Sequence, residues 1–133
     1  MAADSLDVQK WVRRAKMDFD SAAKLVETRF EPPIEVVCYL CQQAAEKILK
    51  AYTIAKTNTR AASHKLEDLL DECAHHSAEF NELKSGCLNL SPYATLARYP
   101  SIIEPTEQHM KQALKDAAKI LELARAELKK LGH

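Results

Sequence analysis

Apolar residues recur at steps of three and four along most of the chain, which is the spacing of an amphipathic helix. The first stripe runs from Val8 to Phe30 and stops before "EPP", and Asp4 or Ser5 is placed to cap its start. The second runs from Ile34 to Ala55, with Pro33 suited to the first helical position, and fades in "KTNTRAAS". These two stripes predict two long helices.

The second half of the chain has a more broken pattern. Ser63 is a good cap for a short helix over "HKLEDLLDECAHH", and "AEFNELKSG" continues that helix after a break near Ser77 and stops at Gly86. Three prolines interrupt residues 87–105, which we predict to be a packed or functional loop with one helical turn. The last stripe, Met110 to Leu131, predicts a third long helix.

Together the stripes predict an all-α fold, because no segment alternates with the period of a strand. Short connections between long amphipathic helices favour antiparallel neighbours. We therefore expect an up-and-down four-helix bundle with an additional short helix. A chain of 133 residues fits one domain, residues 1–133, which buries roughly two-thirds of its unfolded surface.

Charge and hydropathy argue against some classes of function. The formal net charge is zero, so the chain as a whole does not attract nucleic acid or an anionic membrane, and any polyanion must bind to a local patch. No apolar run approaches the roughly 20 residues of a membrane span. The acidic N-terminus "MAADSLDVQKW" is unlike a signal peptide, and we expect a cytoplasmic protein without membrane contact.

Cys38 and Cys41 form a Cys-x-x-Cys pair, which could indicate redox chemistry or a metal site. A redox pair lies at a helix N-terminus, where the thiolate is stabilised, but this pair is at least about a turn inside the second helix. Zinc would need two more ligands, which Cys73, His75 or His76 could offer, but at no recognised spacing. We expect buried packing for these cysteines and predict no metal and no cofactor.

A polar stripe on the second helix is the first candidate for binding. Tyr39, Gln43, Glu46 and Lys50 follow each other at helical spacing, opposite part of the apolar stripe. Such a stripe is most often a solvated face. However, this helix has apolar residues on its flanks too, so these polar groups could instead pair internally, face a cleft or meet a second subunit.

Two further candidates follow the second helix. In "LARYPS", Arg98 and Tyr99 either are a solvated cation and a packed ring, or form a site for a phosphate or a base. His64 occupies the predicted first turn of the third helix, where it forms hydrogen bonds at the helix end or takes part in a site. Catalysis by His64 would need a partner, and none is evident from the linear sequence.

Four segments together resemble the HEPN domain family: "WVRRAKMDFDSA", "CYLCQQAAEKILKAY", "SHKLEDLL" and "YATLARYPS". The resemblance covers nearly the whole chain and implies a four- or five-helix bundle that usually dimerises. It also implies nucleotide binding, and many prokaryotic members act with a minimal nucleotidyltransferase as a toxin–antitoxin-like pair. Other members are metal-independent ribonucleases with an Arg-x4–6-His motif, whose site is built across the dimer.

This chain departs from the ribonuclease pattern. On a helix, that spacing places both side chains on one face, where two subunits can frame one phosphate. No arginine here precedes a histidine at the required spacing; the nearest combinations are Arg60 with His64, Arg98 with His109, and Arg125 with His133. We therefore predict no catalytic residue.

The sequence favours a non-catalytic, homodimeric binding domain for a nucleotide or RNA, or for a nucleotidyltransferase partner. One alternative is a divergent RNA endonuclease that uses Arg98 with His64 or His109. Another is a module that only binds other proteins. The candidate ligand-binding residues are Gln43, Glu46, Lys50, His64, Arg98 and Tyr99.

Overall fold

The computed structural model describes residues 5–59, 63–98 and 104–133, and every regular element among them is helical. The long helices are α1 (Ser5–Thr28), α2 (Ile34–Thr57) and α5 (Glu107–Lys130). Between them lie α3 (Leu66–His76), the 3-10 helix η1 (Ala78–Leu83), α4 (Lys84–Leu90) and the 3-10 helix η2 (Ser91–Thr95). The prediction of an all-α fold is confirmed.

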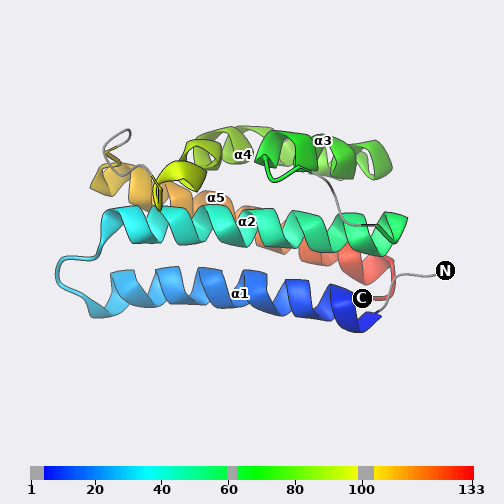
Figure 1. The fold of residues 1–133 in the computed structure, drawn as a ribbon, viewed down its shortest axis with the longest axis horizontal. Helices are drawn as coiled ribbons and strands as arrows, with labels where there is room; N and C mark the ends of the chain where they lie inside the picture. Colours follow the sequence, from blue (N-terminus) through cyan, green and yellow to red (C-terminus); the bar gives the residue numbers. More distant parts are fainter. Residues whose placement is uncertain (1–4, 60–62, 99–103) are drawn as a thin grey trace.

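Helix α2 is the centre of the bundle. It packs against α1 on one side, against α5 behind it, and against α3 and η2 on the other side. Helices α3 and α4, joined by η1, follow one another in the place of a single long helix (Figure 1). Successive long segments run in opposite directions, so the beginning of α1 and the end of α5 lie at the same end of the bundle (Figure 1). This is the expected up-and-down arrangement.

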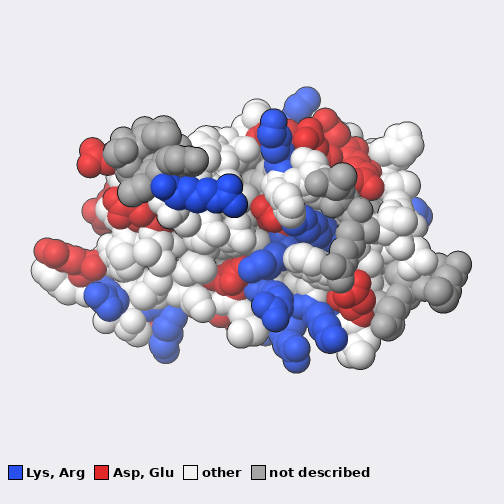
Figure 2. Space-filling view, viewed as in Figure 1, with Lys and Arg blue, Asp and Glu red and all other residues white. Residues whose placement is uncertain are grey.

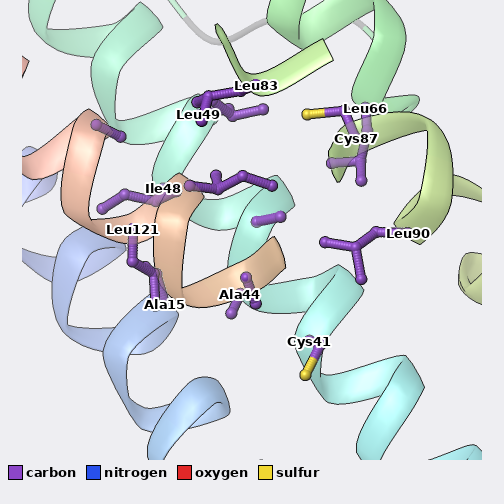
Figure 3. Close-up of a cluster of buried hydrophobic side chains, with 14 of the residues drawn as sticks. Ala15, Cys41, Ala44, Ile48, Leu49, Leu66, Leu83, Cys87, Leu90 and Leu121 are labelled. Carbon is purple, nitrogen blue, oxygen red and sulfur yellow. The ribbon is translucent and has the colours of Figure 1, made fainter. Parts of the chain in front are cut away.

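One continuous apolar core joins all the main helices. Ala15 of α1 and Leu121 of α5 lie on one side of Ile48, and Leu66 and Leu90 lie across from it (Figure 3). Side chains from α2 face both groups, which is why this helix is apolar on most of its circumference. The burial of α2 therefore forces its polar residues either into a network or to the wall of a cavity.

Local signals account for the ends of three helices. Asn58 has a left-handed backbone (φ 61°), and its N–H donates to the Ile54 carbonyl, which ends α2. Ser77 is extended and ends α3, so the predicted break there is confirmed. At the start of α5, the Thr106 hydroxyl accepts from the His109 N–H and the His109 ring accepts from the Thr106 N–H, as in a capping box.

Several local predictions were wrong. Phe30 lies beyond the end of α1 in the turn to α2 and is 99% exposed. Ser63 does not cap α3 and His64 is not in its first turn, because α3 begins only at Leu66; the Ser63 hydroxyl donates to Asp68 instead. Gly86 does not stop a helix, since it is buried inside α4. The predicted loop is helical up to Thr95. Leu90 and Tyr93 bury their side chains in the core, and this packing stabilises the short helices that carry them.

Glu127 of α5 accepts a hydrogen bond from the residue at the break between α3 and η1. Its carboxylate accepts from the Ser77 hydroxyl at 2.7 Å and from Lys130 at 2.6 Å. We expect Glu127→Ala to lower the free energy of unfolding by about 1–2 kcal/mol, because the buried end of this hydrogen bond is lost. Urea denaturation would measure it, with the exposed Glu122→Ala as the control, for which a change within about 0.5 kcal/mol is expected. Equal effects of the two substitutions would contradict this role.

Candidate functional site

The polar stripe of α2 is not a solvated face. Glu46 is only 9% exposed and Lys50 only 6%, and Gln42, which the sequence pattern did not single out, is 1% exposed. Gln43 donates to Gln42 at 2.7 Å, and Gln42 donates in turn to Glu46 at 3.3 Å. Internal pairing, one of the alternatives left open by the sequence, is therefore what the structure has.

Glu46, Lys50 and His64 meet at the edge of the bundle. The Lys50 Nζ donates to Glu46 Oε2 at 2.7 Å and lies 2.6 Å from His64 Nδ1. An ammonium can only donate, so His64 Nδ1 is the acceptor of this bond and its ring proton sits on Nε2. The longer 3.3 Å approach of His64 Nδ1 to Glu46 would need the opposite tautomer, and we assign the shorter bond. His64 thus leaves its Nε2–H available to a ligand.

The network changes the acidity of Glu46. Burial acts to raise its pKa, but hydrogen bonds from Lys50 and Gln42, with the charge of Lys50, outweigh burial and hold the pKa below the ordinary value. Glu46 is therefore a carboxylate at neutral pH and balances the buried charge of Lys50. Glu46 is therefore not a general acid at neutral pH, and the pair contacts His64 and holds its ring.

A cavity of about 430 Å³ opens beside this network, between α2 and the segment that follows η2. His64 and Arg98, which are 34 positions apart in the sequence, both line it. Its wall is completed by the polar stripe and by short side chains near η2: Tyr39, Gln43, Glu46, Ala94, Thr95 and Ala97. The structure thus brings four of the six candidate residues to one cavity.

Arg98 is the exposed cation of this cavity. Its backbone N–H bonds to the Thr95 carbonyl at 3.0 Å, which fixes the chain direction there, while its guanidinium makes no ion pair within the described ranges. Lys50 does not line the cavity wall but supports it through Glu46 and His64. Tyr99 lies outside the described residues, so its predicted role stays a prediction. The arrangement suits an anionic, partly aromatic ligand.

The cysteines are inert packing residues, as predicted. Cys38 and Cys41 are fully buried, and burial is the main reason that their pKa values rise to about 11 and about 12. Both thiols are therefore protonated at neutral pH, which does not suit thiolate chemistry. Among the residues described, no group of three or more metal-ligating side chains comes together.

His109 does not share a cavity with Arg98. It lines a different one, between α4 and the start of α5, together with Asn89, Tyr93 and Gln112. Its Nδ1 is occupied by the capping bond to Thr106 at 2.9 Å. The combination of Arg98 with His109, which the nuclease alternative considered, is therefore not assembled within this subunit.

Comparison with known proteins decides the family. The model of the HEPN domain matches residues 8–128, which is nearly the whole chain. The chain belongs to the HEPN domain family. The resemblance seen in four sequence segments is thus confirmed, and it extends through the helices that bear the cavity of Arg98.

Two solved structures share this HEPN fold. The crystal structure of TT1696 from Thermus thermophilus is 24% identical, with a TM-score of 0.76 over 90% of this chain and 96% of that one. ST0689, described as an archaeal HEPN homologue, is 19% identical, with a TM-score of 0.66 over the same shares. At these identities the likeness concerns the fold alone. No protein with a curated description matches the chain.

None of the helices in the described ranges combines the length and the apolar character needed to cross a membrane. Helices α1 and α5 carry their apolar residues as a stripe toward the core.

Proposed function

We propose that this HEPN protein is a non-catalytic binding domain for nucleotide phosphates, either in a nucleotide or in RNA. The observation that supports this best is the cavity in which the guanidinium of Arg98 and the imidazole of His64 come together. Arg98 can bind a phosphate through two parallel hydrogen bonds, and the Nε2–H of His64 can donate a third. Tyr39 and Gln43 supply a ring and an amide for a base.

Calorimetry with ATP and with a short single-stranded RNA tests this function. We expect Arg98→Ala to weaken binding about tenfold or more, because a hydrogen bond to a charged group contributes about 1.5–3 kcal/mol. Arg125→Ala on α5 is the control, since it removes another exposed arginine, outside the cavity. Absence of binding of both ligands to the native chain, or equal affinity of the two variants, would refute the proposal.

The nuclease alternative now rests on His64 rather than on His109, because His64 and Arg98 line the same cavity. His64 could accept or donate a proton beside a phosphate held by Arg98. An RNA cleavage assay with the native chain and with His64→Ala separates the two functions. Cleavage that is lost in His64→Ala would favour the nuclease, whereas intact RNA leaves the binding function.

The family resemblance also supports two proposals about partners. We propose that the chain forms a homodimer and acts with a minimal nucleotidyltransferase in a toxin–antitoxin-like pair. Size-exclusion chromatography with light scattering tests the dimer, and a strict monomer at high concentration would contradict it. Co-purification with a nucleotidyltransferase encoded beside this chain tests the pair, and separate elution would contradict it.

A further inference from the structure

A second cavity, of about 340 Å³, lies on the face where α1 and α2 pack together, and Asp7, Lys10, Trp11, Arg14 and Lys47 line it. One side chain contacts a lining residue of each cavity. The Nζ of Lys50 lies 5.5 Å from the centroid of the Trp11 ring and 2.6 Å from His64 Nδ1. The two cavities are therefore linked through Lys50, which lies behind both walls.

The charges of this second cavity favour an anion. Lys47 pairs with Asp18, and Lys50 pairs with Glu46, so these two cations are balanced within the protein. Lys10 and Arg14 are exposed and form no ion pair in the described part of the chain, and they stand one turn apart on α1. Figure 2 shows Lys and Arg side chains gathered over the middle of this face, where α1 and α2 lie. Against them the cavity wall has one acid, Asp7.

We propose that Lys10 and Arg14 form a second phosphate-binding site beside Trp11, and that a single strand of RNA crosses from the Arg98 cavity into it. This rests on the function proposed above and names its ligand as a polynucleotide rather than a mononucleotide. Each cavity combines at least one cation with an aromatic ring, Arg98 with Tyr39 in one, and Lys10 and Arg14 with Trp11 in the other. Alternating cations and rings along a surface are what non-specific single-strand binding uses. A mononucleotide would occupy only one of the two cavities.

The test compares two probes on the full chain: ATP, and a single-stranded oligoribonucleotide of about twelve nucleotides. Lys10→Ala with Arg14→Ala is expected to weaken RNA binding about tenfold and to leave ATP binding unchanged. The salt dependence of RNA binding, as log K against log salt, should become shallower by about 1.4, since two phosphate contacts are lost. Lys10→Arg with Arg14→Lys should retain RNA binding, because it keeps both charges.

Two further measurements complete the experiment. Trp11 is the only tryptophan of the chain, so its fluorescence reports directly on the second cavity; RNA is expected to quench it more than ATP does. Lys115→Ala with Lys129→Ala removes the same charge from exposed positions of α5 and should leave RNA binding unchanged. Circular dichroism confirms that each variant is folded.

The outcomes separate this inference from the proposed function. If RNA and ATP both bind but the Lys10/Arg14 variant keeps its RNA affinity, the second site is refuted and the proposed function stands. Equal losses for RNA and ATP would mean one shared site, which also refutes it. Binding of ATP without RNA refutes it as well, and binding of neither refutes both proposals.

Discussion

The Glu46→Ala variant is expected to lose about 3 kcal/mol of its free energy of unfolding, because it leaves the buried ammonium of Lys50 without its carboxylate. Lys50 is only 6% exposed, so water replaces only part of the lost interaction. Gln42 loses its acceptor in the same step. Urea denaturation measures the change, and a chain of this size is expected to unfold in a single transition.

A double-mutant cycle isolates the pair. Lys50→Ala alone leaves Glu46 as a buried charge and is expected to be destabilising too. The double variant removes both charges, so it should lower the free energy of unfolding by less than the sum of the two single losses. Glu46→Gln keeps the shape and an acceptor oxygen but not the charge, and we expect an intermediate loss. Additive effects of the two single substitutions would show that Glu46 and Lys50 do not act as a pair.

The contribution of Glu46 to the free energy of unfolding depends on pH in a definite direction. Because its pKa is lower in the folded chain than its ordinary value of 4.5, it contributes stability above that pH and loses this contribution as the pH falls through the lower, folded value. The native chain should therefore lose more stability on acidification below about pH 4.5 than Glu46→Gln does. Parallel pH profiles of the two proteins would contradict the lowered pKa.

The second large effect concerns Phe80 of η1, a short helix that joins α3 to α4. Its side chain is fully buried, and its ring centroid lies 4.6 Å from that of Tyr52 on α2. We expect Phe80→Ala to lower the free energy of unfolding by about 3–5 kcal/mol, because it removes apolar contacts and leaves a cavity. Denaturation in urea would measure this loss.

Phe30 provides the matched control for Phe80. It is the same residue type but 99% exposed, so Phe30→Ala should change stability by no more than about 0.5 kcal/mol. The apolar pattern of the sequence assigned Phe30 to the core and did not single out Phe80. If both substitutions cost the same, the placement of η1 over α2 would be wrong.

The candidate site could be predicted only in part from the sequence. Gln43, Glu46, Lys50 and His64 were candidates because the first three lie at helical spacing and the last opens the next segment. The spacing could not say whether the stripe faces water, because that depends on what packs against α2 from α1 and α3. Gln42 was missed, since one step along a helix turns a side chain to another face and only the bonds to its neighbours reveal its role.

The second cavity, too, could be predicted only in part from the sequence. Lys10 and Arg14 are a visible pair on α1, four positions apart, but they are ordinary surface cations until Lys47 of α2 is placed beside them. Trp11 was read as part of the apolar stripe, and it does pack against the core. Its second role, beside the ammonium of Lys50, depends on the packing of α1 against α2.

The sequence by itself determined the three long helices, their order and the family, because apolar periodicity is local and short connections leave few ways to pack long helices. Only the tertiary structure decided where the polar residues of α2 lie, that Phe30 is outside the core, and that His64 and Arg98 share a cavity. Those facts depend on contacts between residues far apart in the chain. Burial and pairing are properties of such contacts, and no pattern along a single helix contains them.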